Sequence, residues 1–155
     1  MTIFSSQTEA SRAKSTPLTF SIITPHHGKA DASDLLFCCI ASVADQENIK
    51  LEQIVQHTGG VSGLWNKLSR DLNLSKKTAH YTLRILEEKT SSFYDLLHRG
   101  LQRVQGTFFG CLQPEEQYLP GALAAVEKEF QTHPDLDVVI TSCLVIDPKK
   151  NHPIP

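Results

Sequence analysis

The chain has 155 residues, 40% of them hydrophobic, which suits one globular domain with a buried core. Its formal net charge of -2 gives no overall electrostatic reason to expect a nucleic acid or a membrane surface as partner. No apolar run approaches the roughly 18 residues that a membrane-spanning helix needs, and residues 1–17 lack the apolar stretch of a secretory signal. We therefore expect a cytoplasmic protein without an integral membrane segment.

The cysteines give no metal or disulfide pattern. Four are present, Cys38, Cys39, Cys111 and Cys143, and none forms a C-x-x-C pair. All four lie inside apolar segments, which favours buried, reduced thiols over a metal site or a disulfide framework.

The first half of the chain alternates strand and helix patterns. Residues 1–17 are rich in Ser, Thr and small or charged residues, and we expect a disordered arm followed by one domain over residues 18–147. Apolar spacing and β-branched content predict, in order, a strand at Leu18–Thr24, a loop at His26–Gly28, a helix at Asp31–Asp45, a strand at Leu51–Gln56, a Gly-rich loop over residues 57–63 and a helix at Ser62–Leu72.

The second half repeats this rhythm. It predicts a strand at Tyr81–Leu86, a helix at Ser91–Gln105 capped by Gly106, a strand at Thr107–Leu112, a helix at Pro120–Thr132 and a buried strand at Asp137–Ile146, before a polar tail over residues 148–155. Alternating strands and helices indicate an α/β fold, with a mostly parallel sheet and helices on both faces.

One polar turn follows the strand at Thr107–Leu112. It reads Gln113-Pro114-Glu115-Glu116 and precedes the helix that begins at Pro120. Open α/β sheets bind ligands at the carboxyl ends of their strands, so this turn places two carboxylates where chemistry would occur.

Six short segments of the sequence, taken in order, resemble the nucleotide-sugar-binding part of family 2 glycosyltransferases, which have the GT-A fold. They are FSIITP (Phe20–Pro25), SVADQ (Ser42–Gln46), LEQIV (Leu51–Val55), YDLLHRGLQRVQG (Tyr94–Gly106), YLPGAL (Tyr118–Leu123) and HPDLDVVITSCLVID (His133–Asp147). The resemblance spans about Leu18–Asp147. It implies transfer of a sugar from a nucleotide-diphosphate donor to an acceptor that the sequence does not identify, with no nucleic acid as partner.

The resemblance also implies a site. The family holds a divalent cation, Mg²⁺ or Mn²⁺, with a DxD-type motif, and the register from Tyr118 aligns that motif with the turn after Leu112. This assigns the metal to Glu115, with Glu116 in reserve. The nucleotide-binding positions that correspond to the family's are Thr24, Pro25, His57, Thr90 and Gln113.

The sequence departs from the family at several of these positions. His57 stands where relatives carry an aspartate that accepts the imide N–H of uracil, and Thr90-Ser91-Ser92 replaces a later Asp-x-Gly. The family's catalytic base lies beyond its fifth strand, and no carboxylate of this chain can be nominated for that role. The chain is then either a fragment of a longer enzyme or a degenerate member that binds without transferring.

Other interpretations remain open at this point. Glu115 and Glu116 also fit a solvated acidic turn, and His26, His27 and His57 fit exposed loop histidines. A non-catalytic nucleotide-sugar-binding or interaction domain would share the fold.

A helix-turn-helix is the alternative of another class. Leu68–Leu86 has a basic segment at Ser75–Thr78 that would start a recognition helix. The conformation of Tyr81–Leu86 separates the two folds, because a strand there supports the α/β domain and a helix supports DNA binding.

Overall fold

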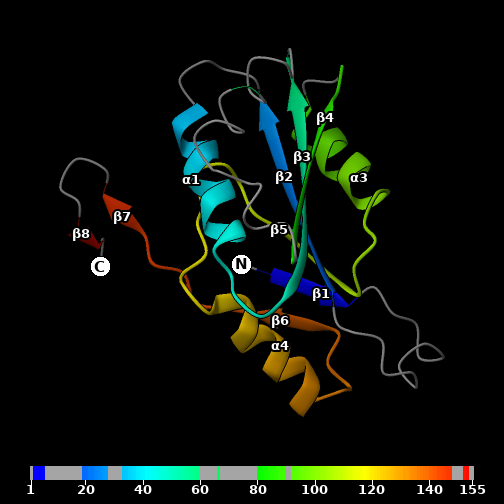
Figure 1. Ribbon diagram of the computed structural model, residues 1–155, viewed down its shortest axis with the longest axis vertical. Helices are drawn as coiled ribbons and strands as arrows, with labels where there is room; N and C mark the ends of the chain where they lie inside the picture. Colours follow the sequence, from blue (N-terminus) through cyan, green and yellow to red (C-terminus); the bar gives the residue numbers. More distant parts are fainter. Residues whose placement is uncertain are drawn as a thin grey trace.

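The computed structural model describes residues 2–5, 19–27, 33–59, 66, 80–89, 92–147 and 152–153. In chain order the elements are β1 (Thr2–Ser5), β2 (Thr19–His27), α1 (Ser33–Ala44), β3 (Lys50–Thr58), β4 (Tyr81–Glu87), α3 (Phe93–Leu101), β5 (Phe108–Cys111), α4 (Ala122–Thr132), β6 (Val138–Ile140), β7 (Ile146–Asp147) and β8 (His152–Pro153). Figure 1 shows their arrangement.

Six strands form one sheet in the order β4-β3-β2-β5-β1-β6. The four strands β4, β3, β2 and β5 are parallel, and β1 runs antiparallel between β5 and β6. The strands β7 and β8 form a separate antiparallel pair. The sheet is therefore mostly parallel, and its four parallel strands end at the same edge.

Helices cover both faces of this sheet. Figure 1 shows α1 and α3 on opposite sides of β2 and β3. On the α3 face, Gly100 approaches the sheet so closely that an added Cβ would collide with Ile23 and touch Gln56. A side chain at this position would force α3 away from the sheet, which explains a glycine inside a helix.

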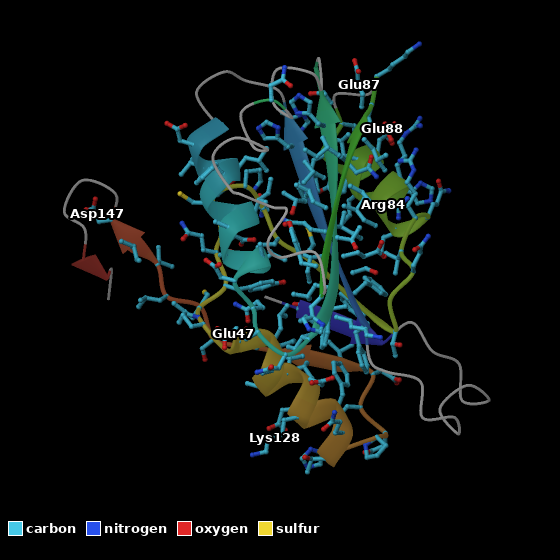
Figure 2. All side chains as sticks on the ribbon, in the orientation of Figure 1. Glu47, Arg84, Glu87, Glu88, Lys128 and Asp147 are labelled. Carbon is cyan, nitrogen blue, oxygen red and sulfur yellow. The ribbon has the colours of Figure 1, made fainter. Side chains whose placement is uncertain are left out.

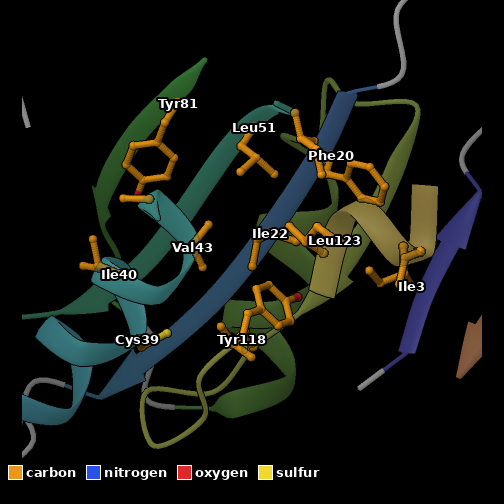
Figure 3. Close-up of a cluster of buried hydrophobic side chains, with 14 of the residues drawn as sticks. Ile3, Phe20, Ile22, Cys39, Ile40, Val43, Leu51, Tyr81, Tyr118 and Leu123 are labelled. Carbon is orange, nitrogen blue, oxygen red and sulfur yellow. The ribbon is translucent and has the colours of Figure 1, made fainter. Parts of the chain in front are cut away.

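The main core lies on the α1 face (Figure 3). Alternate residues of β2, Phe20 and Ile22, point to this face and are fully buried. They pack with residues of α1, α4, β1 and β5, among them Ile3, Leu36, Cys39, Ile40, Val43, Phe108, Leu123, Val126 and Phe130. Burying a large aliphatic or aromatic side chain stabilises a fold by about 1.5–3 kcal/mol, so this cluster is what holds α1 and α4 on the sheet.

Buried charges fasten the α3 face. Glu52, which is 6% exposed, accepts hydrogen bonds from Ser21 Oγ, from the main-chain N–H of Gln105 (2.8 Å) and from Arg84 (3.2 Å). Arg84 also donates to the carbonyl of Arg103 at 3.2 Å. A buried carboxylate is tolerated when it is paired and hydrogen-bonded, and here its partners tie the segment after α3 to β2 and β4.

The strand predicted at Tyr81–Leu86 is confirmed, because Tyr81–Glu87 forms β4 and pairs in parallel with β3. The helix-turn-helix interpretation is therefore wrong, since it required a helix here. The predicted helix at Ser62–Leu72 and most of the Gly-rich loop lie outside the described residues.

The strands β2 and β3 are longer than predicted. The sequence placed His26 and His27 in a loop after Pro25, but the parallel ladder continues through Pro25↔Gln56, His26↔His57 and His27↔Thr58. Pairing with a neighbouring strand thus overrides the local signal of a proline. As a result His26 and His57 are buried strand residues, and neither is an exposed loop histidine.

Two predicted helix boundaries differ in the structure. The helix α3 begins after Ser92, whose hydroxyl accepts a hydrogen bond from Asp95 N, but ends at Leu101 instead of Gln105. The predicted cap Gly106 lies beyond the helix and donates its N–H to Ser21 Oγ at 2.8 Å. The helix α4 begins at Ala122 after Gly121, whose φ of 76° lies in the left-handed region that favours glycine.

The prediction of an interior strand at Asp137–Ile146 is wrong. Only Val138–Ile140 joins the main sheet, as the edge strand β6, and Ile140 is 77% exposed. Ile146–Asp147 belongs instead to the small β7-β8 pair. Three residues of β6 find a partner in β1, and this short antiparallel pairing takes the place of an interior position.

The amino terminus and two cysteines also differ from expectation. Thr2–Ser5 lies within the predicted arm, yet it forms β1 and buries Ile3 completely. The remainder of that arm lies outside the described residues. Cys38 and Cys143 are exposed, although all four thiols are free as expected. Among the described helices none combines the length and apolarity required to cross a membrane.

Candidate functional site

The candidate site lies at the edge of the sheet where β2, β3, β4 and β5 end. The register places His26 of β2 beside His57 of β3, and His57 beside Glu87 of β4. On the other side of β2, the N–H of Leu112, which follows β5, donates to the carbonyl of Ile23 at 3.0 Å. The acidic turn therefore follows the carboxyl end of β5, which pairs with β2 as far as Ile23, at the middle of that strand.

The two histidines form a hydrogen-bonded pair. Their Nδ1 atoms are 2.7 Å apart, their ring centroids are 4.9 Å apart, and their ring planes differ by 11°. A ring nitrogen lies about 1.2 Å from its ring centre, so rings that meet nitrogen to nitrogen in one plane have centroids about 5 Å apart. The rings thus meet edge to edge and almost coplanar, and an N–H of one points at the lone pair of the other.

Burial keeps this pair neutral. His26 is 3% exposed and His57 is 6% exposed. Burial lowers the pKa of His26 to about 4, with smaller contributions from His57 and His27. The pKa of His57 is also lowered by burial, which outweighs the opposite effect of the Glu87 carboxylate. Both imidazoles are therefore uncharged at neutral pH, because desolvation disfavours the protonated form.

The end of β4 holds the main chain of His57. The N–H of Glu88 donates to the carbonyl of His57 at 2.8 Å. The carboxylate of Glu88 is buried against Arg103 and Arg99 of the α3 region, and Arg103 also donates to Gln56 Oε1 at 3.1 Å. Figure 2 shows Glu87 and Glu88 together at this end of the strand. The backbone that carries His57 is thus fixed from the α3 side.

Below the pair, on the α1 face, a chain of buried polar groups links three strands. Tyr81 Oη donates to Gln53 Oε1 at 2.7 Å, and Gln53 Nε2 donates to Thr24 Oγ1 at 2.9 Å. The Cys39 thiol lies at the end of this chain, and burial raises its pKa to about 12. Burial likewise raises the pKa of the Cys111 thiol to about 11. Neither thiol supplies a thiolate nucleophile at neutral pH.

The acidic turn uses one of its two carboxylates to fold. The N–H of Gln113 donates to Glu116 Oε2 at 2.8 Å, and the N–H of Glu116 donates to the carbonyl of Gln113 at 3.0 Å. Glu116 thereby closes the turn on itself. The Glu115 side chain is exposed, and no hydrogen bond or ion pair of it appears within the described part of the chain.

The residues of the acidic turn can hold a cation only if the substrate and water supply the remaining ligands. No group of three or more His, Cys, Asp or Glu side chains with metal-binding geometry occurs among the described residues. Mg²⁺ in nucleotide sites is typically held by one or two carboxylates together with substrate phosphates and water. The turn offers two carboxylates, Glu115 and the adjacent Glu116, which is the number that such a nucleotide site needs.

The other predicted site residues lie in different environments. Thr24 is fully buried, and its hydroxyl accepts from Gln53. Pro25 is buried within β2, whereas Gln113 is exposed on the acidic turn. Thr90 lies outside the described residues.

Sequence reasoning missed the pairing of His26 with His57. The available signal was the double histidine directly after the β2 pattern, together with a histidine directly after the β3 pattern. In parallel neighbouring strands of similar length such residues meet at one edge. The buried Gln53 was missed as well, because a glutamine inside an apolar run gives no sign of the partners that satisfy it.

Comparison with known proteins finds similar structures but no matching sequence. No protein-family model matches the chain, and no curated protein matches it by sequence.

Several solved structures share the fold. TarS from S. aureus (residues 1–349) matches with a TM-score of 0.61 and 14% identity, over 76% of this chain and 33% of that one. A structure of the same TarS fragment in complex with UDP matches with a TM-score of 0.60 and 15% identity, over 76% of this chain and 33% of that one.

The mannosyltransferase PcManGT from Pyrobaculum calidifontis, in complex with GDP-Man and Mn²⁺, matches with a TM-score of 0.57 and 15% identity, over 75% of this chain and 33% of that one. This chain thus spans about a third of the length of these structures. At such identities the likeness shows the fold alone, and this fold is GT-A-like: a mostly parallel sheet with helices on both faces.

Proposed function

We propose that this chain is a family 2 glycosyltransferase-like domain that binds a nucleotide-diphosphate sugar at the carboxyl edge of its parallel sheet. The observation that carries the proposal is that a neutral histidine pair and an acidic turn both lie at the carboxyl ends of neighbouring parallel strands, in a GT-A-like fold. The structural neighbours with UDP and with GDP-Man and Mn²⁺ support a donor of this class.

The charges divide the site into two parts. The uncharged, planar pair of His26 and His57 suits the base of a nucleotide, which is also uncharged and planar. The carboxylates of Glu115 and Glu116 repel a bare diphosphate, so they suit one only if a divalent cation lies between them. When bound, that cation would neutralise the diphosphate and stabilise it as a leaving group.

The protein's own groups hold these two parts in place. Pro25 and the hydrogen bond from Leu112 N to Ile23 O fix the path of β2 between the histidines and the turn. Gln113, which is exposed on the turn, and Thr90 are both assigned as nucleotide contacts from the resemblance alone. Acceptor recognition and a catalytic base are not assigned to any residue.

A second candidate function is binding without transfer. One observation favours it. A carboxylate oxygen of Glu116 accepts a hydrogen bond from the N–H of Gln113, so Glu115 is the carboxylate of the turn that is more available to a cation. A weakened cation site would lower the rate of sugar transfer more than the affinity for the nucleotide.

The test is calorimetric titration with UDP, GDP, CDP and ADP, each with and without Mn²⁺, followed by an assay of donor hydrolysis. We expect binding of at least one nucleotide that strengthens with Mn²⁺, and we expect Glu115→Gln to abolish the Mn²⁺ dependence with the fold intact.

The matched control is Glu47→Gln, which removes an exposed carboxylate near α4, far from the end of β4 that carries Glu87 (Figure 2). An unchanged Mn²⁺ dependence in Glu115→Gln rules out the metal assignment. The absence of heat with every nucleotide rules out the proposed function, whereas binding without hydrolysis selects the second candidate.

A further inference from the structure

The hydrogen bond between the two histidines fixes which nitrogens carry protons. A neutral imidazole has one N–H and one lone pair, so an Nδ1–Nδ1 hydrogen bond needs one ring protonated at Nδ1 and the other at Nε2. The edge-to-edge geometry at 2.7 Å leaves two arrangements, which differ in the ring that donates.

The surroundings select His26 as the donor. His26 Nε2 is buried, and the described residues offer it no hydrogen-bond partner. If His26 accepted at Nδ1, this buried Nε2 would carry an unpaired N–H, and orphaned buried N–H groups are rarer than buried acceptors that lack a donor. With His26 Nδ1–H donating, Nε2 is only a lone pair.

The position of Glu87 supports the same assignment. Glu87 lies across from His57 in the register of β3 and β4, on the side away from His26, and its charge acts on the His57 ring. A nearby carboxylate stabilises an N–H that faces it more than a lone pair. His57 therefore accepts at Nδ1 from His26 and carries its proton on the outer nitrogen, Nε2.

We propose that His57 presents only a hydrogen-bond donor to the ligand, and that His26 is the positioning residue that fixes this polarity. This inference rests on the proposed function and names the class of base that the site takes. His57 Nε2–H pairs with a ring nitrogen that carries a lone pair, as in cytosine, and opposes the protonated ring nitrogen of uracil.

The site should discriminate between CDP and UDP, because uracil would bring a second N–H donor against that of His57. A uracil ring N–H that meets His57 Nε2–H leaves both groups without an acceptor, and a site built to pair a group rejects the unpaired analogue by tenfold or more. We expect CDP to bind at least about tenfold more tightly than UDP in the presence of Mn²⁺.

The first test reverses this polarity by mutation. His57→Asp places a carboxylate, which only accepts, where the donor was, so the preference should invert towards UDP. Because a buried charge at this position can impair folding, His57→Asn serves as the second variant, since its amide both donates and accepts and should bring the two affinities within about threefold. A parent chain that binds UDP as tightly as CDP, or variants that keep the preference for CDP, would overturn the proposal.

The second test reads the protons directly and needs no ligand. In the ¹⁵N NMR spectrum of the chain labelled at histidine, we expect the His57 ring to be protonated at Nε2 and the His26 ring at Nδ1. His26→Leu removes the donor and should return His57 towards a mixture of tautomers, whereas His98→Gln, on the exposed face of α3, should leave the His57 signals unchanged.

A proton on His57 Nδ1 in the parent chain contradicts the inference. Binding of GDP or ADP without binding of CDP or UDP overturns the base preference and leaves the proposed function standing, whereas no binding of any of the four nucleotides overturns both. The spectrum decides the tautomer by itself.

Discussion

Acidification should destabilise this fold through His26. The unfolded chain titrates this imidazole at an ordinary pKa of 6.5, whereas burial and the adjoining His57 and His27 hold the pKa of the folded state at about 4. Between these two values the unfolded chain binds a proton that the folded chain excludes, so the free energy of unfolding falls as the pH falls below about 6.5. Above that pH the imidazole is neutral in both states, and this destabilisation is absent.

The magnitude follows from the two pKa values. Linkage over the interval from about pH 7.5 to about pH 5 gives a loss of roughly 2 kcal/mol from His26 alone. His57 adds a loss of the same sign, because burial lowers its pKa as well, although Glu87 opposes the shift. Against a total stability of about 5–15 kcal/mol for a domain, this loss is measurable.

The assay is urea denaturation at the two pH values for the parent chain, for His26→Asn and for a control, His98→Gln. The control removes an exposed histidine of α3 and should lose as much stability on acidification as the parent. His26→Asn should lose about 2 kcal/mol less than the parent over the same interval. If His26→Asn loses as much as the parent, the pair does not exclude a proton and the reasoning is refuted.

Three further predictions concern the packing that supports the site. Gly100→Ala should lower the free energy of unfolding by about 1–3 kcal/mol despite the better helix propensity of alanine, because the new Cβ collides with Ile23; a stabilised variant in urea denaturation would contradict the close approach of α3. Tyr81→Phe should cost about 1–3 kcal/mol by thermal denaturation, since Gln53 Oε1 loses its donor in a buried site, and a neutral result would show that another donor reaches it. Ile3→Ala should cost about 2–5 kcal/mol in urea, as expected for a fully buried isoleucine, whereas a change below about 0.5 kcal/mol would show that β1 is not part of the sheet.

The parallel half of the fold could be predicted from the sequence because its signals are local. For example, the alternation of apolar and polar residues over Tyr81–Leu86 predicts strand β4, and the helical spacing of apolar residues between Pro120 and His133 predicts α4. Each of these segments carries enough information within about ten residues to be assigned before its neighbours are known.

The edges of the site could not be predicted in this way. Pro25, Gln56 and His57 are polar or strand-breaking in isolation, and they are strand residues here because β2 and β3 pair with each other up to Thr58. The buried Gln53 is acceptable only because Tyr81 and Thr24, from two other strands, satisfy its amide. Such partners are set by the tertiary structure, so a local pattern cannot reveal them.

The antiparallel end of the sheet was beyond prediction for the same reason. The segment Thr2–Ser5 is too short for its residue pattern to predict a strand, and its partners β5 and β6 lie far along the chain. The strong β pattern of Asp137–Ile146 predicted an interior strand, whereas only Val138–Ile140 reaches the sheet and does so at its margin. A β pattern reports that a segment tends to be extended and does not report which neighbour it will find.

The place of β1 has a consequence for the order in which the molecule assembles. Ile3 pairs with Gly110 and Val139, which are synthesised long after it. Contacts so distant in sequence form slowly, because a long loop must close before they bring any stabilisation. We therefore expect the parallel strands to fold as an early unit, and β6 to join the sheet last, after β1 has docked on β5.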